Sequence, residues 1–266
     1  MKKFLAKSYI YLLLVFLYAP IVFIAVFSFT EAKALGNWTG FSTGLYQSLF
    51  TGGTQGGGSL LRAFENTIVI ALVAAGAAML LGTMAAIGIY HLKNGVKKQA
   101  TQFLNSVPMI NPDVITGVSL FLLFVFLHFS QGYATVILAH ITFCTPYVVL
   151  SVMPKLSQMN PNIYEAALDL GATPMYAFRK VIFPELRPGM ISGFILAFTM
   201  SLDDFAVTFF TRGTVGLETL STYIYADARK GGLTPELRPL MTLIFLLILI
   251  LLIIFNVRTS RRNNCK

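Results

Sequence analysis

Long apolar runs recur along the whole chain. Six windows are each close to the length of about 20 residues that a bilayer-spanning helix needs, and they fall at roughly 9–29, 67–90, 107–127, 133–153, 189–210 and 239–257. The pattern predicts an all-α polytopic membrane protein with six transmembrane helices. The first run, YLLLVFLYAPIVFIAVFSF, is longer than a signal-peptide core and lacks a small-residue cleavage site, so we expect it to be retained as a span.

The polar stretches between these windows define the expected segments. A first helix with a cytoplasmic amino terminus takes 1–30, an outer loop takes 31–66, and a five-helix core takes 67–257. The core contains a cytoplasmic loop at 154–188 and an outer loop at 211–238, and a basic cytoplasmic tail follows at 258–266. A short connection around HFSQGY joins the third and fourth spans.

Two stretches of the outer loops have a composition of their own. The glycine-rich TGGTQGGGS lacks a following Gly-Lys-Ser/Thr, so it is typical of a flexible linker rather than of a phosphate-binding loop. In the last outer loop, Leu217, Leu220 and Ile224 have helical spacing and predict a short amphipathic helix. That helix would either lie against the outer surface of the protein or dock a partner.

Composition agrees with a membrane protein. Of 266 residues, 56% are hydrophobic and only 12% are charged, whereas soluble domains carry about 25% charged residues. The net charge of +9 reflects topology, because 14 of the 20 basic residues fall on the side that holds both termini. These are Lys2, Lys3, Lys7, Lys93, Lys97, Lys98, Lys155, Arg179, Lys180, Arg187, Arg258, Arg261, Arg262 and Lys266. We therefore expect contact with membrane lipid and no nucleic-acid partner.

The cysteines and histidines predict neither a disulfide framework nor a set of metal ligands. Cys144 lies in the fourth span and Cys265 in the basic tail, so we expect no disulfide between them. The histidines, His91, His128 and His140, share no metal-ligand spacing, so no metal site is expected.

The loop at 154–188 has clear helix start and stop signals. Asn160 can cap a helix that has Pro161 in its first turn, and Gly171 is placed to end it in a left-handed conformation. Its apolar stripe is Ile163, Ala166, Ala167 and Leu170. Thr173 and Pro174 repeat the start signal for a second helix, containing Met175, Phe178 and Ile182, that runs to Pro184.

This helix–turn–helix has two interpretations on physical grounds. The small side chains of Ala166 and Ala167 would let another surface approach closely, which favours docking of a cytoplasmic partner. Alternatively, the segment is a solvated connector that folds against its own helix bundle.

The spacing within this loop resembles the EAA loop of permease subunits in ATP-binding-cassette importers. The family pattern is Glu-Ala-Ala, three residues, Gly, nine residues, Ile, one residue and Leu-Pro. The chain has Glu165-Ala166-Ala167, then Gly171, then Val181, with Phe183-Pro184 in the place of Leu-Pro. NPDV at 111–114, HITFCTPYVV at 140–149 and SLDDFAVTFF at 201–210 further resemble the spermidine/putrescine permeases of the C type.

The resemblance implies a MetI-like type I importer permease in a bacterial cytoplasmic membrane. Its implied partners are a second permease subunit, two copies of a cytoplasmic ATPase and an extracytoplasmic polyamine-binding protein. It also implies that Glu165, Ala166, Ala167, Gly171 and Pro184 couple the permease to the ATPase. The chain has no Gly-x-x-x-x-Gly-Lys-Ser/Thr, so we expect no cofactor in this subunit, with ATP and Mg²⁺ bound by the ATPase. The chain is then not itself an enzyme.

Three carboxylates lie within the apolar windows, where an ionisable group is costly and marks a candidate functional site. Asp113 is near the start of the third window, and Asp203 and Asp204 are within the fifth. A polyamine path needs spaced carboxylates and aromatic faces, which Asp113, Asp203, Asp204 and Phe205 provide, with Phe209 and Phe210 nearby.

Neighbouring residues on a helix point about 100° apart, so Asp203 and Asp204 cannot face one point unless the helix breaks. The region also resembles anion permeases of the same family, which commonly have an acidic residue followed by Phe, as in Asp204-Phe205. We therefore interpret Asp204 as the cap of a helix break, or as the partner of a basic group, and Asp203 as the better candidate for contacting substrate.

Other functions remain as alternatives. A permease for another solute, such as an amino-acid derivative or ferric iron, shares the family features. A stand-alone secondary transporter or channel is disfavoured by the long inner loop and by the lack of an evident inverted repeat. An intramembrane enzyme would need a nucleophile–base or metal constellation, and the sequence alone reveals none.

Overall fold

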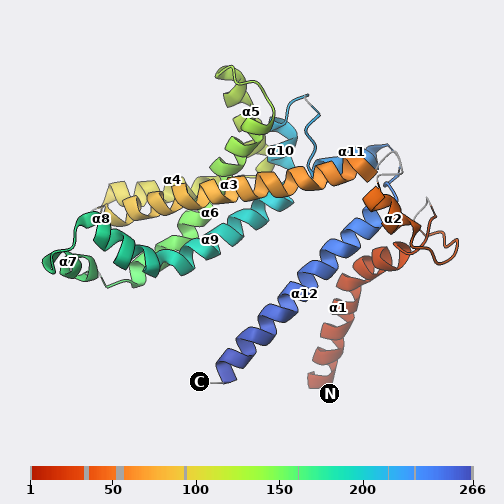
Figure 1. The fold of residues 1–266 in the computed structure, drawn as a ribbon, viewed down its shortest axis with the longest axis horizontal. Coiled ribbons are helices and arrows are strands. Elements are labelled where there is room, and N and C mark those ends of the chain that lie inside the picture. The colour runs from red at the N-terminus through yellow and green to blue at the C-terminus, as the bar shows by residue number, and fades with distance from the viewer. Residues whose placement is uncertain are drawn as a thin grey trace. The chain divides into compact units, whose positions relative to one another are not determined.

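The computed structural model describes residues 2–32, 36–51, 57–92, 95–160, 162–214, 216–230 and 232–264 (Figure 1). These residues form helices and no strand, which confirms the all-α fold class. The elements are α1 (Lys2–Phe27), α2 (Gly44–Thr51), α3 (Gly57–His91), α4 (Val96–Ile110), α5 (Asp113–Phe126), α6 (Tyr133–Gln158), α7 (Asn162–Asp169), α8 (Pro174–Ala177), the π-helical turn η1 (Phe178–Ile182), α9 (Phe183–Asp203), α10 (Ala206–Thr211), α11 (Leu220–Arg229) and α12 (Leu237–Asn264).

The chain divides into two compact units, 1–62 with 224–266, and 63–223. In the first unit α1 packs along α12, and α2 contacts α12 (Figure 1). The buried Arg238, at the start of α12, donates a hydrogen bond from Nη1 to the carbonyl oxygen of Ala32 at 2.8 Å. This bond ties the segment after α1 to the first turn of α12.

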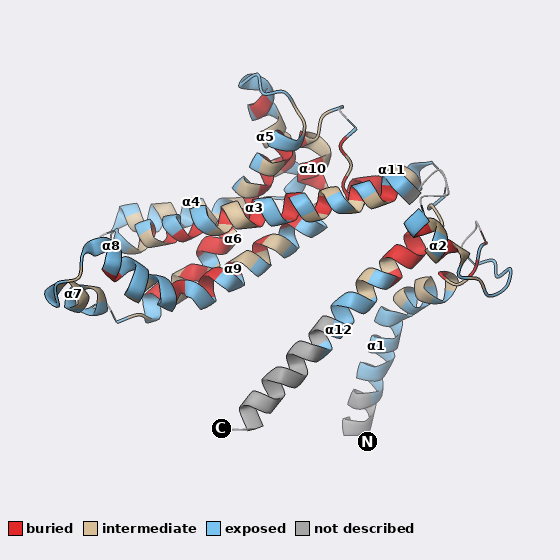
Figure 2. Cartoon of the chain, viewed as in Figure 1, coloured by how far each residue is buried: buried red, intermediate tan, exposed pale blue. Residues whose placement is uncertain are grey.

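In the second unit, α3, α4, α6 and α9 run side by side, while α5 packs on α10 (Figure 1). Buried residues lie on the sides of α3, α6 and α9 that face one another, whereas the described part of α1 is almost wholly exposed (Figure 2). Exposed apolar surface on such long helices suits contact with lipid rather than with water.

Four of the six predicted windows each fall on one helix, whereas 107–127 and 189–210 each cover parts of two helices. Among the described residues, four helices are long and apolar enough to cross a membrane, Ser8–Phe27, Gly58–His91, Tyr133–Gln158 and Pro174–Asp203, and the pair α4 and α5 makes a fifth if it is counted as one span. The described apolar part of α12, Leu237–Ile250, is shorter. The observed helices are consistent with six spans.

The third window was predicted at 107–127 as one helix, and this is wrong. The chain bends by 106° between α4 and α5. Pro112 disfavours helical geometry at the residue before it, and Asn111 is accordingly extended, with φ −74° and ψ 135°. The side-chain amide of Asn111 then donates to the Thr116 hydroxyl at 3.1 Å, across the break.

The loop boundaries also differ from those expected. The outer loop predicted at 31–66 contains α2, and α3 begins at Gly57 rather than at 67, since Leu60 and Ala63 are buried and extend the packed face of α3. Residues 52–56, which make up most of the glycine-rich stretch, lie outside the described residues. At the other end, α12 continues through Asn264, so the predicted tail at 258–266 begins within a helix.

The predicted amphipathic helix of the last outer loop forms, but with a later start. α11 begins at Leu220, and the Thr219 amide donates to the Thr222 hydroxyl at 2.9 Å at its first turn. Leu217 precedes the helix and is buried against Ile70 and Val136. Leu217 therefore anchors the segment that leads into α11 rather than lining a face of that helix.

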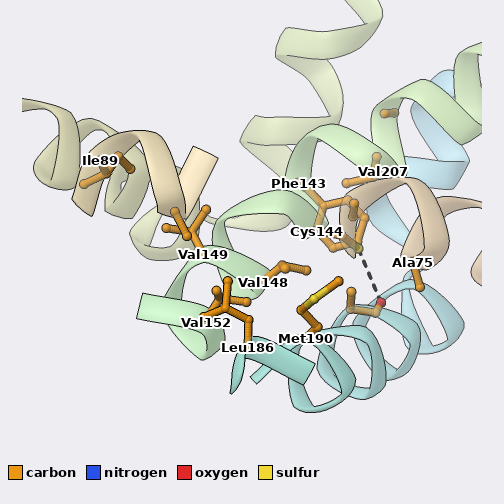
Figure 3. Close-up of a cluster of buried hydrophobic side chains, with 14 of the residues drawn as sticks. Ala75, Ile89, Phe143, Cys144, Val148, Val149, Val152, Leu186, Met190 and Val207 are labelled. Atoms are coloured by element: carbon orange, nitrogen blue, oxygen red, sulfur yellow. Dashed lines mark hydrogen bonds between the residues drawn. The ribbon is translucent and has the colours of Figure 1, made fainter. Parts of the chain in front are cut away.

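The core of the second unit is built on α6. Val148, Val149 and Val152 of α6 pack with Leu186 and Met190 of α9 (Figure 3). Cys144 is buried in the same cluster, and its thiol donates to the carbonyl oxygen of Ala197 at 3.4 Å (Figure 3). Cys265 lies outside the described residues.

Glycines let two neighbouring helices approach Val148 from opposite sides. A Cβ added at Gly82 of α3 would lie 2.7 Å from the Cβ of Val148, and one at Gly193 of α9 would lie 3.1 Å from its Cγ1. Small residues at helix interfaces are the usual means of close packing in membranes, where association depends on van der Waals contact.

We expect Gly82→Ala to destabilise the protein, because overpacking of a tight contact costs about 1–3 kcal/mol. The matched control is Gly76→Ala in the same helix, where an added Cβ would meet no atom within 4 Å. Thermal stability of the detergent-solubilised protein, followed by size-exclusion chromatography after heating, measures both. Equal midpoints for the two variants would contradict the close packing of α3 on α6.

Candidate functional site

The fifth apolar window is broken at the two aspartates. α9 ends at Asp203 and α10 begins at Ala206, so Asp204 and Phe205 form a joint between two helices. The backbone of Asp204 is extended, with φ −64° and ψ 133°. The prediction of one continuous span at 189–210 is thus wrong. Because the helix breaks here, the geometry of an intact helix no longer sets the directions of the two carboxylates, and the contacts of each residue decide them.

The Asp204 carboxylate satisfies the first turns of α10. Its Oδ1 accepts a hydrogen bond from the Val207 amide at 3.2 Å, and its Oδ2 accepts from the Thr208 amide at 2.8 Å and from the Thr208 hydroxyl at 2.9 Å. Amides at the start of a helix lack partners within the helix, and a negative charge there is favoured by the helix dipole. The interpretation of Asp204 as the cap of a helix break is confirmed.

His140 of α6 completes this arrangement. Its Nε2 lies 2.9 Å from the Thr208 hydroxyl and 3.4 Å from Oδ2 of Asp204, and its Nδ1 lies 2.6 Å from the Ser201 hydroxyl. The side chains of His140 and Asp204 are 1% and 4% exposed. Asp204 therefore has a potentially basic neighbour within its own chain.

Sequence reasoning missed the role of His140, because the histidines were compared only for metal-ligand spacing. The available signal was a lone histidine within an apolar span. A buried imidazole needs hydrogen-bond partners. The polar residues of the segment SLDD, together with Thr208, were the possible partners of His140 in the sequence.

Ser201, His140 and Asp204 are the residue types of a hydrolase triad, which the sequence did not reveal. Nε2 of His140 lies closer to the Thr208 hydroxyl, at 2.9 Å, than to Oδ2 of Asp204, at 3.4 Å, so the hydroxyl and not the carboxylate is its nearer partner. Ser201 is also only 3% exposed, so a substrate cannot reach its hydroxyl in this conformation. The hydrogen bonds of this cluster instead connect α6 to α9 and α10.

Asp203 has a different environment. Its side chain is exposed, and no hydrogen bond or ion pair involves it among the described residues. One residue beyond the cap, Phe205 stacks on Phe209 with ring centroids 5.4 Å apart, and the Arg212 guanidinium lies over the Phe209 ring at 5.5 Å. The joint thus carries one exposed carboxylate, at Asp203, and a stacked aromatic pair begins two residues later, one ring of which already receives a cation.

Asp113 is the first residue of α5 and is also exposed. α5 comes close to α10 at Gly117, where an added Cβ would lie 3.0 Å from the carbonyl oxygen of Ala206. The structure thus brings the helix that starts at Asp113 against the helix that starts after Asp204. Within the described part of the chain, no direct contact joins Asp113 to Asp203.

The inner loop forms the two predicted helices and their turn. The amide of Asn162 donates to Oδ1 of Asn160 at 3.0 Å before α7, and Gly171 has φ +85° after it. The Tyr176 amide donates to the Thr173 hydroxyl at 3.4 Å, which confirms Thr173 as the cap of the second helix. Pro161 lies outside the described residues.

The second helix was expected to end at Pro184, and this is wrong. α8 passes through the π-helical turn η1 into α9, so one helix of 30 residues runs from Pro174 to Asp203. Proline lacks an amide hydrogen and its ring crowds the preceding turn. The wider π-helical turn accommodates it, with the Phe183 amide donating to the carbonyl oxygen of Phe178, five residues back.

The apolar stripe of α7 is left largely uncovered by the described residues. None of the described residues of α7 is buried, and Leu170, in the turn that follows, is 89% exposed. A shallow hollow of about 550 Å³ lies beside this turn, lined by Ala167, Leu170, Gly171, Ala172, Thr173 and Tyr176. This exposure disfavours the interpretation of the loop as a connector folded against its own bundle.

The fold defines a helical membrane protein in which the loop at 154–188 leaves apolar side chains exposed among the described residues. The family described as "Binding-protein-dependent transport system inner membrane component" matches residues 78–260. The chain belongs to this family, and it is a multi-pass membrane protein.

Curated relatives cover most of the chain. It is 38% identical over 235 residues to the "Putrescine transport system permease protein PotI" of Escherichia coli (strain K12), covering 86% of this chain and 81% of the relative. It is 35% identical over 262 residues to the "Spermidine/putrescine transport system permease protein PotC" of Haemophilus influenzae, covering 98% of both chains.

Solved transporters share the fold at low sequence identity. A bacterial alginate ABC transporter, solved in complex with a periplasmic protein bound to an alginate pentasaccharide, matches 98% of this chain and 93% of its own, with a TM-score of 0.69 and 18% identity. The MetNI methionine ABC transporter, in an inward-facing conformation, matches 74% of this chain and 92% of its own, with a TM-score of 0.58 and 22% identity. Both confirm a MetI-like permease fold.

Proposed function

We propose that this chain is the permease subunit of a bacterial ATP-binding-cassette importer for polyamines such as spermidine and putrescine. The observation that carries the proposal is the similarity to a spermidine/putrescine permease along 98% of both chains. The fold by itself does not select the solute, because transporters of alginate and of methionine share it.

The geometry of the joint supports a cationic solute. An ammonium group binds to carboxylates through charge-assisted hydrogen bonds and to aromatic rings through their faces. Asp203 offers an exposed carboxylate, and Phe205 and Phe209 offer stacked rings at the start of the helix that follows. Asp113 is a second candidate contact at the start of α5, whereas Asp204 is occupied by the amides of α10.

The proposed assembly contains a second homologous permease subunit, two copies of a cytoplasmic ATPase and an extracytoplasmic polyamine-binding protein. The excess of basic residues in the inner segments supports cytoplasmic termini and a cytoplasmic loop at 154–188. In this arrangement Glu165, Ala166, Ala167 and Gly171 meet the ATPase, which binds ATP and Mg²⁺, and this subunit needs no cofactor.

The continuous helix from Pro174 to Asp203 suggests how the two sites communicate. Its inner end adjoins the docking surface at Gly171, and its other end is the joint at Asp203 and Asp204. A displacement of the loop by the ATPase would thus be transmitted along one rigid element, and Pro184 lies in that element just after the π-helical turn.

The test is uptake of labelled spermidine and putrescine by the complete importer in proteoliposomes, with ATP inside and the binding protein outside. ATP-dependent accumulation of either polyamine is expected. Failure to take up any polyamine, with retained ATP-dependent uptake of another solute, would remove the polyamine assignment and leave the importer class intact. Uptake by this chain alone, without an ATPase, would instead indicate a secondary transporter.

We expect Asp203→Asn to raise the KM for polyamine uptake about tenfold, the scale of one charge-assisted hydrogen bond. The isosteric amide keeps the shape of the side chain, so assembly with the other subunits should be unchanged. Phe209→Leu is a companion variant that removes one ring face. Wild-type kinetics for Asp203→Asn would exclude this carboxylate from the solute path.

A further inference from the structure

The residues around His140 form a chain of hydrogen bonds. The Thr208 hydroxyl donates to Oδ2 of Asp204, so its oxygen is available to accept a hydrogen bond from Nε2 of His140. At the other ring nitrogen, Nδ1 of His140 forms a hydrogen bond of 2.6 Å with the Ser201 hydroxyl. The order of these bonds runs from Ser201 through His140 and Thr208 to Asp204.

These hydrogen bonds join the helices on both sides of the joint, α9 and α10, to a third helix, α6. Ser201 belongs to the last turn of α9, Thr208 belongs to α10, and His140 lies on α6 between them. The carbonyl oxygen of Asp204 is held separately, by the Ser221 hydroxyl at 2.6 Å. Hydrogen bonds therefore hold Asp204, in the joint, through both its side chain and its backbone. A helix break without such contacts would leave the direction of α10 relative to α9 free.

We propose that His140 is a positioning residue for solute passage, and that it acts by fixing the direction of Asp203. The Asp204 carboxylate is held against α10 and His140 and is buried, whereas the adjacent Asp203 carboxylate is exposed and makes no hydrogen bond to that cluster among the described residues. The inference rests on the proposed function in that Asp203 is taken to contact the solute.

The chain offers a matched pair of variants for a test. Thr208→Val removes the hydroxyl that links His140 to Asp204, while the Thr208 amide still donates a hydrogen bond to the Asp204 carboxylate. Thr211→Val removes an equally buried hydroxyl of the same helix that bonds only to the carbonyl oxygen of Val207, outside the chain of bonds. His140→Leu removes both ring nitrogens, and His140→Gln restores one acceptor and one donor.

The first measurement is independent of the solute. A cysteine placed by Asp203→Cys, in a chain carrying Cys144→Ala and Cys265→Ala, is labelled with a cationic thiol reagent in the assembled importer. Thr208→Val and His140→Leu are each expected to change the labelling rate about tenfold, the scale of one buried hydrogen bond. Thr211→Val is expected to stay within about twofold.

The second measurement is polyamine uptake by the importer with Asp203 intact. Thr208→Val is expected to raise KM about tenfold with little change in the maximal rate per assembled complex, and His140→Gln is expected to recover part of the loss seen in His140→Leu. A defect confined to the amount of assembled complex would overturn the proposal, as would equal labelling rates for Thr208→Val and Thr211→Val. If the wild type takes up no polyamine, the labelling result still decides whether His140 positions residue 203.

Discussion

Solute uptake is expected to fall about 100-fold in Glu165→Lys, while the protein still inserts and assembles its own helices. Glu165 lies in the first turn of α7, it is exposed, and the helix that carries it buries no described residue. Reversal of its charge therefore costs the subunit only the helix-dipole contribution, about 0.3–1 kcal/mol. In a docked interface, the loss of a carboxylate paired with a basic group costs about 2–5 kcal/mol.

Glu185→Lys provides the control for this change. Glu185 is also exposed and belongs to the same loop at 154–188, but it lies within the continuous helix from Pro174 to Asp203 and outside the Glu-Ala-Ala motif. Uptake and solute-stimulated ATP hydrolysis, measured with the complete importer, should survive in Glu185→Lys and be lost together in Glu165→Lys. Survival of both activities in Glu165→Lys would show that the coupling assignment is wrong.

Asp204→Asn is expected to reduce the amount and thermal stability of the assembled protein, in contrast to Asp203→Asn. The Asp204 carboxylate accepts three hydrogen bonds on two oxygens. The amide offers one oxygen and one donor NH₂ group, so at least one buried donor at the start of α10 loses its acceptor. Each such unsatisfied group costs about 1–3 kcal/mol.

The two aspartate variants control one another, since both replace a carboxylate by its isosteric amide at adjacent positions. Yield of the purified complex, its thermal midpoint and its uptake kinetics are measured for each. The expected division is impaired assembly at 204 and impaired uptake with normal assembly at 203. The reverse result, loss of assembly at 203 and normal assembly with lost uptake at 204, would exchange the roles of the two residues.

Much of the inner loop was predictable because its signals are local. Asn160, Gly171 and Thr173 act through their own backbone neighbourhoods, and each takes the expected role at a helix end. The end of the second helix was predicted wrongly at Pro184, because a proline usually interrupts a helix. A π-helical turn at Phe178–Ile182 absorbs it, and the packed Leu186 and Met190 continue the helix beyond.

The sequence by itself determined the helical membrane class, most of the apolar helices and the helical loop at 154–188, because hydrophobic period, length and capping residues act over short stretches of chain. Helix geometry separated Asp203 from Asp204, and the family resemblance favoured Asp204 as the cap and Asp203 as the candidate contact. Only the tertiary structure decided that His140, distant in sequence, joins Ser201, Thr208 and Asp204 in one buried chain of hydrogen bonds. A buried polar group must find its partners across whichever helices pack beside it, and no local pattern specifies which helices those are.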